Sequence, residues 1–359
     1  FIILGDINQL PPVRNTAILG YKMLELPVVE LTEVYRQALN SPIITLAHTV
    51  KDGIQMCEAE LRSPKCNVDK GAAGKLTIKP WKKKLDAFDA CKLASSFTIA
   101  AITANEFDPE QDMVLIPFNK HFGTLEFNKY IAQHLGEKRA ATVFEVIAGF
   151  NKYYVAVGDK VLVNKRFGVI TRITKNGSYF GIPPQEPSVH LNRWGYNTEH
   201  HAKKMAAASS IDDIDSLLVS LEDVEDRKNQ ASHFIDVRLE ARDSDDTLTT
   251  SSEVNSMLFA YALTVHKAQG SEWRKVYCLF HQSHNVMMCR ELLYTAITRA
   301  REELLIICEP NHFQKAVATQ RIKGNTLAEK AEYFKGKQAA NEAQVTASSL
   351  AALTNEEEE

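Results

Sequence analysis

The chain has 359 residues, of which 45% are hydrophobic and 24% charged, and a net charge of −3. These values are typical of a soluble globular protein of roughly two or three domains, and they exclude a general electrostatic attraction for nucleic acid. The longest apolar run, at 97–104, is far shorter than the ~20 residues that cross a bilayer. The six cysteines show no zinc-site spacing, which indicates reduced thiols in a cytosolic protein.

The chain opens on an apolar run, FIIL, which is followed by Gly5-Asp6, Gln9 and two prolines. Such a run predicts a strand buried on both faces of a parallel sheet. Ligands of these sheets lie beyond the carboxyl ends of the strands, which is where Asp6 and Gln9 stand. The alternative is a turn that Asp6 caps and the prolines stiffen. Because the chain opens inside a fold and without methionine, we expect it to be a fragment.

Strands and helices then alternate, as in an α/β fold. Ser41 and Pro42 predict the start of a helix, whose apolar residues continue at helical spacing to Val50. The segment DMVLIPFNK predicts the next strand, and FGTLEFNKYIAQHLG predicts the helix after it.

The pattern changes after Ala140, where short alternating strands and turns follow one another. Asn176-Gly177 is a signal for a two-residue hairpin turn. We expect a small β-barrel or sheet inserted into the α/β fold. Residues 205–246 are acidic and rich in serine, and we expect a connecting, partly mobile segment there.

The α/β pattern returns near residue 257. Strands are predicted in MLFAYALTVHKAQG, KVYCLFH and LLIICEP, with a helix over ELLYTAITRAREE that carries Arg299. The chain from Asn311 is predicted to be helical and then to become a disordered acidic tail.

Four segments occur in a specific order: GDINQLPP, LTEVYRQ, TVHKAQGSEW and LLYTAITRAR. They resemble motifs III, IV, V and VI of superfamily 1 helicases, and the chain looks most like the Dda-like and RecD-like branch, which moves 5′ to 3′ on single-stranded DNA. The resemblance covers about residues 1–310. It implies an α/β fold of RecA-like helicase domains, the P-loop NTPase fold with a parallel sheet, and an inserted small SH3-like β-barrel.

The resemblance also implies a domain organisation. It assigns 1–24 to the end of RecA-like domain 1A, 25–139 and 251–310 to RecA-like domain 2A, 140–250 to the inserted SH3-like domain 2B with its acidic segment, and 311–359 to the helical and then disordered tail.

By the same resemblance, Gln9 senses the γ-phosphate of ATP, and Arg36 and Arg299 reach the triphosphate from the second RecA-like domain. Planar guanidinium groups of fixed charge suit the negative charge of phosphoryl transfer. We therefore expect these three residues to be catalytic. The resemblance also implies three further nucleotide contacts. Tyr35 packs on the adenine, the backbone at Gly270 approaches the ligand closely, and Glu272 meets the nucleotide sugar. The alternatives are surface arginines and a core tyrosine.

The DNA backbone is expected to contact Asn119, Thr264, His266 and Lys267, through bonds that carry no sequence information. The alternative for the first three is a role in caps and turns. Basic residues in the insertion could also line the bound strand, and they are Lys160, Lys165, Arg166, Arg172 and Lys175. The segment KPWKKK could touch nucleic acid or be a solvated loop.

A motor of this kind needs G-x-x-x-x-G-K-[ST] and an acidic Walker B pair. Neither is present, since GAAGKLT has Leu76 in place of Ser or Thr and Asp69 in place of the first Gly. In family order both motifs precede motif III. We therefore expect the ligands of Mg²⁺ upstream, no metal site in this chain, and negligible ATP hydrolysis by the chain alone.

The function implied is the C-terminal part of an ATP-dependent 5′-to-3′ DNA helicase, with ATP and Mg²⁺ as cofactors and single-stranded DNA and the duplex fork as partners. Replication or recombination proteins are further possible partners. We expect a monomer that does not bind a membrane and that works in the cytoplasm of a bacterium or of a phage-infected cell. Two alternatives stay open: a non-catalytic relic that binds single strands, and an RNA helicase of the same superfamily.

Overall fold

The computed structural model describes residues 2–11, 18–30, 41–56, 61, 74–81, 84–141, 144–148, 151–163, 166–175, 178–180, 215–221, 234–239 and 258–356. The chain divides into two compact units: unit 1 is Phe1–Lys84, Leu115–Pro117 and Thr264–Glu359, and unit 2 is Leu85–Val114 and Phe118–Leu263. Among the helices of the described ranges, none has both the length and the apolar character that a membrane span requires.

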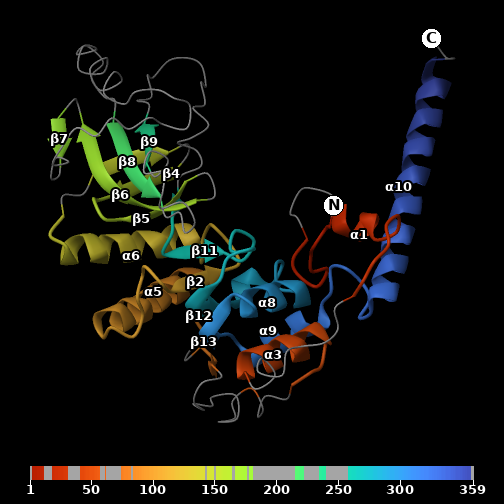
Figure 1. Ribbon diagram of the computed structural model, residues 1–359, viewed down its shortest axis with the longest axis horizontal. Helices are drawn as coiled ribbons and strands as arrows, with labels where there is room; N and C mark the ends of the chain where they lie inside the picture. The colour runs from red at the N-terminus through yellow and green to blue at the C-terminus, as the bar shows by residue number, and fades with distance from the viewer. Residues whose placement is uncertain are drawn as a thin grey trace. The chain divides into compact units, whose positions relative to one another are not determined.

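A five-stranded sheet has the order β1-β13-β12-β2-β11, of which Figure 1 labels β2, β11, β12 and β13. Its strands are β1 (Lys75–Lys79), β13 (Ala300–Ile307), β12 (Trp273–Leu279), β2 (Met113–Ile116) and β11 (Ala262–Thr264). Strand β13 pairs in parallel with both β1 and β12. Leu304 and Ile306 of β13 are completely buried, as expected for a parallel sheet covered on both faces. The predicted α/β fold with a parallel sheet is confirmed.

Helices α3 (Pro42–Lys51), α8 (Arg290–Ile297) and α9 (Pro310–Ala318) belong to unit 1, where α8 packs on the other two (Figure 1). Helix α3 has Ser41 at its N-cap and Pro42 in its first turn, so the predicted start is confirmed. Its apolar face is buried, including Ile43, Leu46 and Val50.

The boundary between α8 and β13 differs from the prediction. Helix α8 ends at Ile297 and β13 begins at Ala300, so Arg299 lies in the turn between them and not on a helix. The reason is tertiary, because the segment from Ala300 pairs with β1 and β12 on both sides. Strand pairing therefore overrides the helical preference of the charged residues that follow Arg299.

The predicted buried strand at the start of the chain is wrong. Ile2 and Leu4 are 90% and 86% exposed, and residues 2–6 form no strand. A buried parallel strand needs a neighbour that accepts and donates its backbone hydrogen bonds. The five-stranded sheet does not include residues 2–6, and Ile2, Ile3 and Leu4 stay exposed in the described part of the chain.

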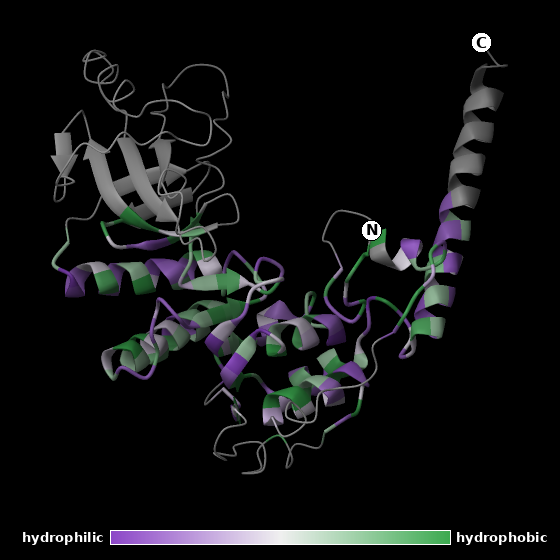
Figure 2. Cartoon of the chain, viewed as in Figure 1, coloured by the Kyte–Doolittle hydropathy of each residue, from purple (hydrophilic) through white to green (hydrophobic). Residues whose placement is uncertain are grey.

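Unit 2 contains helices α5 (Ala87–Thr103) and α6 (Thr124–Lys138), which pack together. Figure 2 shows hydrophobic and hydrophilic residues alternating along α6, as an amphipathic helix requires. Asp86 caps α5 by accepting a hydrogen bond from the backbone N–H of Asp89.

The predicted β insertion consists of antiparallel strands. One sheet has the order β10-β5-β6-β8-β9 with β7 paired to β6, and β3 and β4 form a separate pair. The strands are β3 (Phe144–Ala148), β4 (Asn151–Val155), β5 (Lys160–Val163), β6 (Arg166–Lys175), β7 (Ser178–Phe180), β8 (Asp215–Leu221), β9 (Phe234–Leu239) and β10 (Leu258–Phe259). Lys175 pairs with Ser178, which confirms the predicted hairpin.

Residues 205–246 contain more structure than the sequence analysis expects. Strands β8 and β9 lie in this stretch and pair antiparallel, and β8 also pairs with β6. The expectation of a simple connecting segment is therefore wrong for these two strands. Both strands are short, and most of their residues are apolar. The acidic and serine-rich sequence around them masks the hydrophobic pattern that would predict a strand.

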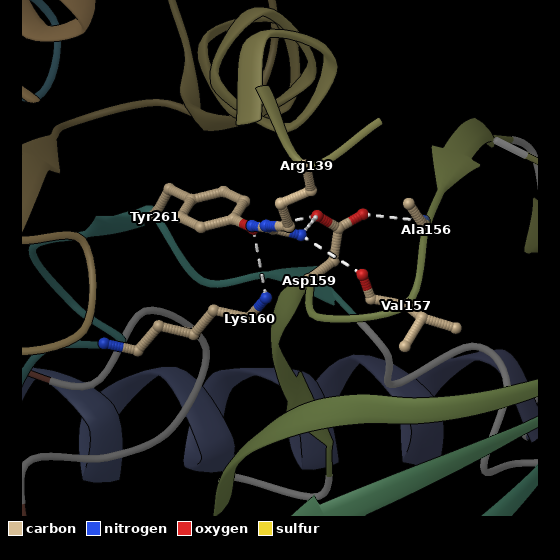
Figure 3. A network of polar contacts seen from close by, with 6 residues as sticks. All are labelled: Arg139, Ala156, Val157, Asp159, Lys160 and Tyr261. Carbon is tan, nitrogen blue, oxygen red and sulfur yellow. Dashed lines mark hydrogen bonds and ion pairs between the residues drawn. The ribbon is translucent and has the colours of Figure 1, made fainter. Parts of the chain in front are cut away.

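A buried polar network joins the end of α6 to the β insertion (Figure 3). The Asp159 carboxylate, which is 1% exposed, accepts from Ala156 N at 2.8 Å, Tyr261 Oη at 2.9 Å and Arg139 Nη1 at 3.0 Å. Burial raises the pKa of Asp159, while these donors act in the opposite direction. The three donors Arg139, Ala156 and Tyr261 satisfy the hydrogen-bonding capacity of the buried Asp159 carboxylate, so the network rigidly joins these segments of unit 2.

Trp81, in KPWKKK, is buried and belongs to the core of unit 1. Its Nε1 donates to the carbonyl of Phe280 at 2.8 Å, just before the short 3-10 helix η3 (Gln282–His284). The suggested contact of Trp81 with nucleic acid is therefore wrong, because its ring is only 8% exposed.

Four cysteines are free thiols buried in the described part of the chain: Cys91, Cys278, Cys289 and Cys308. Burial raises the pKa of Cys91 to about 12 and that of Cys289 to about 11. These thiols are inert structural residues.

The C-terminal helix is longer than expected. Helix α10 (Leu327–Glu356) continues through the Ala/Ser/Thr-rich stretch that the sequence analysis expects to be disordered. It packs against the short helix α1 (Ile18–Lys22) near the start of the chain, as Figure 1 shows.

Candidate nucleotide site

The segment Asp6–Leu10 of GDINQLPP forms a compact turn, which we call the GDINQ loop. The Gln9 N–H donates to the carbonyl of Asp6 at 3.2 Å. The Asp6 carboxylate accepts from Asn8 N at 2.9 Å and from Gln9 Nε2 at 3.3 Å. These are the contacts of a capped turn, so Asp6 has the structural role that the sequence analysis left open.

Two segments distant in sequence hold the GDINQ loop within unit 1. The Leu10 N–H donates to Thr295 Oγ1 of α8 at 2.9 Å, and the Leu10 carbonyl accepts from Gln269 Nε2 at 2.7 Å. Leu10 is 4% exposed and Thr295 is completely buried. Because a buried N–H without an acceptor costs about 1–3 kcal/mol, these bonds fix the loop against motifs V and VI.

Arg299 is held in the turn after α8 by three hydrogen bonds. Its Nε donates to the Thr295 carbonyl at 2.9 Å, its Nη1 to the Ser271 carbonyl at 3.0 Å, and its Nη2 to Thr298 Oγ1 at 2.9 Å. The side chain is only 5% exposed. A guanidinium has five N–H donors, so two remain beyond these contacts with described residues.

The surroundings of Arg299 are acidic and polar. Burial lowers the pKa of Arg299, and Glu272, Tyr294 and Asp6 act in the opposite direction. Burial and then the Asp6 carboxylate raise the pKa of Tyr294. The structure thus brings together motif III, represented by Asp6, with residues of motifs V and VI around one cation.

Gly270 and Glu272 lie in motif V, between β11 and β12. Gly270 has a φ of +82°, a conformation that favours glycine, and a Cβ built there would meet no atom within 4 Å. The backbone is therefore open at this position in the chain. Glu272 is exposed, and it is close enough to Arg299 to affect its titration.

Tyr35 and Arg36 lie outside the described residues. Their predicted places at the adenine and at the triphosphate stay predictions.

Three predicted DNA-contacting residues lie together at the end of β11 and in the turn that follows it. Thr264 is 6% exposed, and its hydroxyl accepts from Lys267 N at 3.4 Å, as in a turn. Lys267 is exposed. The Nε2 of His266 is buried without a hydrogen-bond partner among the described residues. Burial and then Arg321 lower the pKa of His266.

Asn119 and Lys160 belong to unit 2. Asn119 is exposed at the exit of β2, and its Oδ1 accepts from Thr124 Oγ1 at 3.0 Å at the start of α6. Lys160 is only 4% exposed, and its Nζ donates to the carbonyls of Pro109 and Glu110 at 3.1 and 2.7 Å. Lys160 therefore does not line a DNA groove. The side chains of the other basic residues suggested for the insertion lie outside the described ones.

Three residues at this site were not predicted from the sequence: Tyr294, Thr295 and Lys330, whose Nζ donates to the Ile7 carbonyl and to Asn8 Oδ1 of the GDINQ loop. The first two lie in the motif LLYTAITRAR, so helical spacing from Arg299 was an available signal for them. Lys330 lies in the tail, where the resemblance provides no guide.

The described residues contain no group of three or more His, Cys, Asp or Glu side chains that could hold a metal ion. Arg299 is a buried cation fixed by three hydrogen bonds, and the backbone at Gly270, next to the Ser271 carbonyl that it contacts, is open.

Residues 259–307, which include motif V and Arg299, match the family model of the UvrD-like helicase C-terminal domain. The ATP-dependent RecD2 DNA helicase of Deinococcus radiodurans is 26% identical over 325 residues, which cover 90% of this chain and 35% of that protein. The RecBCD enzyme subunit RecD of Mycobacterium tuberculosis is 34% identical over 67 residues, which cover 19% of this chain and 12% of that protein. The chain thus spans about a third of the RecD2 helicase and less of the RecD subunit.

Two solved structures show a looser likeness. The Pif1 helicase from Candida albicans has a TM-score of 0.40 at 15% identity, covering 92% of this chain and 67% of that one. The Bacteroides Pif1 helicase in complex with ADP-AlF3 and ssDNA has a TM-score of 0.40 at 14% identity, covering 84% of this chain and 60% of that one. The sequence matches carry the conclusion: residues 259–307 match the UvrD-like helicase C-terminal domain, and the chain is similar to the ATP-dependent RecD2 DNA helicase over 90% of its length.

Proposed function

We propose that this chain supplies the second motor domain and the coupling loop of an ATP-dependent DNA helicase, which moves 5′ to 3′ on single-stranded DNA and unwinds duplex. The observation that supports this most is the meeting of three helicase motifs in unit 1. The GDINQ loop is bonded to Thr295 and Gln269, and Asp6 lies within electrostatic reach of Arg299.

In this proposal Arg299 and Gln9 contact the γ-phosphate of ATP and respond to its presence or loss. The free donors of Arg299 bind the oxygens on which negative charge grows during phosphoryl transfer. When bound, ATP supplies the phosphoryl group and Mg²⁺ neutralises its charge. Gln9 is joined to motif VI through Leu10 and Thr295, so a shift at the phosphate moves the loop and α8 together.

The DNA side of the proposal rests on motif V. His266 and Lys267 contact backbone phosphates, since the buried Nε2 of His266 has no partner in the described chain and Lys267 is exposed. Asn119 and Thr264 are also proposed to hydrogen-bond the DNA backbone. Only backbone contacts are involved, so binding is independent of sequence.

The remaining features are part of the same proposal. Arg36 is a second catalytic cation and Tyr35 packs on the adenine. The antiparallel β region is an SH3-like domain 2B that helps to hold the strand. The enzyme works as a monomer in DNA replication or recombination, in the cytoplasm of a bacterium or of a phage-infected cell.

The test is to express the chain together with the residues encoded upstream of Phe1 and to measure ATP hydrolysis with and without single-stranded DNA. The proposal predicts a G-x-x-x-x-G-K-[ST] motif upstream and hydrolysis that DNA stimulates. Arg299→Ala should lower kcat by about 10³-fold or more, in the range of an arginine finger. The matched control is Arg301→Ala, because Arg301 is exposed two residues further along the same segment.

Three results would contradict the proposal. An upstream sequence without the phosphate-binding motif would favour a single-strand-binding relic. Unwinding of RNA duplexes in preference to matched DNA would favour an RNA helicase. Unwinding only of substrates with a 3′ tail would reverse the direction.

A further inference from the structure

The C-terminal helix α10 contacts the GDINQ loop directly, although more than 300 residues separate them. The Nζ of Lys330 donates to the carbonyl of Ile7 at 3.5 Å and to Oδ1 of Asn8. Lys330 is 4% exposed, which is unusual for a lysine. A buried ammonium is costly unless it is hydrogen-bonded, so these contacts are needed for the side chain to stay charged there.

An aromatic contact places α10 against the same end of the chain. Phe334, one turn after Lys330, is 3% exposed and lies 5.1 Å from the ring of Tyr21 in an edge-on arrangement. A Cβ built on Gly20 would approach the Phe334 ring to 2.1 Å, so helix α1 and α10 meet closely. The contact fixes Lys330 in position over the loop.

A third contact connects the turn before α10 to helix α8. The Glu291 carboxylate of α8 is 3% exposed, and its Oε1 accepts from the backbone N–H groups of Arg321 and Ile322 at 2.9 Å each. These residues lie in the turn between α9 and α10. Helix α8 therefore holds the GDINQ loop directly through Thr295, and it also holds the turn that leads to Lys330.

We propose that Lys330 is a positioning residue that holds the GDINQ loop at Ile7 and Asn8 while Thr295 holds it at Leu10, so that Gln9 stays in register with Arg299. This inference rests on the proposed function for its consequence, but the contact itself does not. Without Lys330, Asn8 and Ile7 lose a shared donor and the loop has more freedom. Gln9 then meets the phosphate less often in the productive geometry.

The first experiment follows the loop in the chain itself and needs no nucleotide. Amide hydrogen exchange at residues 7–10 is compared for the native chain, Lys330→Met and Lys335→Met. Lys335→Met is the matched control, because Lys335 is exposed on the same helix and pairs with Glu332. Exchange should be about tenfold faster in Lys330→Met, as for a loss of about 1.4 kcal/mol, and unchanged in Lys335→Met.

A double-mutant cycle separates direct contact from general loosening of α10. Asn8→Ala removes the other partner of the bond from a half-buried loop position, and it reports on the contact even if Lys330→Met folds poorly. With a direct contact, the double variant exchanges no faster than Lys330→Met alone. Additive effects of the two changes, or native exchange in Lys330→Met, would overturn the proposal.

The functional readout uses the ATP-hydrolysing polypeptide described above. A misplaced Gln9 should lower the DNA-stimulated kcat by about tenfold, with KM for ATP within about twofold of the native value. A rise in KM at native kcat would mean that Lys330 supports nucleotide binding and not positioning. If the polypeptide hydrolyses no ATP but the loop exchanges faster in Lys330→Met, the proposed function fails and the contact stands.

Discussion

Replacing Thr295 by valine should detach the GDINQ loop from α8. Valine has nearly the shape of threonine but no hydroxyl, so the Leu10 N–H loses its acceptor at 2.9 Å while both residues stay buried. The hydroxyl also donates to the Glu291 carbonyl at 2.6 Å, but a helix carbonyl has a backbone donor as well. The main cost is therefore the buried, unpaired N–H of Leu10, about 1–3 kcal/mol.

Thr49→Val is the matched control for this change. Thr49 lies on α3, and its hydroxyl donates to the carbonyl four residues earlier at 2.9 Å, as that of Thr295 does. Thr49 is half-buried, its hydroxyl hydrogen bond is exposed to solvent, and the hydroxyl has no second partner in the described structure. Thr49→Val should change the free energy of unfolding by no more than about 0.5 kcal/mol.

Two measurements follow the effect of Thr295→Val. Urea unfolding is monitored by the fluorescence of Trp81 and Trp273, which are buried in unit 1. Hydrogen exchange on a peptide that contains Leu10 should be about 10- to 100-fold faster than in the native chain. If Thr295→Val and Thr49→Val behave alike in both assays, the loop is not held by α8 and the reasoning about the site is wrong.

Three further predictions concern other parts of the chain. Asp159→Asn should destabilise unit 2 by about 1–3 kcal/mol in thermal unfolding, since it weakens three hydrogen bonds of a buried carboxylate, whereas Asn at the exposed Asp89 should have no measurable effect. Single-strand binding should strengthen as the pH falls from about 7.5 to about 6 at constant salt. Burial lowers the pKa of His266, so the imidazole is neutral in the free chain. A bound phosphate would raise that pKa, so His266 takes up a proton when DNA binds. Affinity for DNA is therefore lost as the pH rises through the pKa of His266 in the complex. The pH dependence should vanish in His266→Asn, and its persistence there would contradict the assignment. A thiol reagent at about pH 8 should not label the four buried cysteines in the folded chain, because a pKa of about 11 leaves only about one thiolate in 1,000 at Cys289. Rapid labelling of Cys278 or Cys308 before unfolding would show that the core is open.

Elements with a strong local signal were predictable from the sequence. Helix α3 starts at Ser41-Pro42 as capping preferences require, and the hairpin at Asn176-Gly177 follows from its turn chemistry. The order of the four motifs, through the resemblance, implied the parallel α/β sheet, which is confirmed, whereas the convergence of Gln9, Arg36 and Arg299 on one triphosphate stays a prediction. These signals are local or belong to a known pattern, so no long-range contact was needed to read them.

Features that depend on distant partners were not predictable. The helix expected through Arg299 ends early because β13 pairs on both sides, and Ile2, Ile3 and Leu4 are exposed because no strand of the described chain pairs with them. Lys330 gives no sign of its burial, since a lysine in a helix is usually solvated. Its role depends on Asn8 near the opposite end of the chain, and only the folded chain brings the two together.

The three bonds that hold Arg299 have an energetic consequence for any anion that meets it. Fixing a free arginine side chain costs about 2 kcal/mol of rotamer entropy, and here that cost falls on folding because the side chain is already ordered. A phosphate that binds there does not have to order the arginine side chain, so less of the electrostatic attraction is offset by lost side-chain entropy. A lysine in the same turn would carry the charge but could not reproduce the three divergent bonds, so it would have to be ordered by the ligand itself.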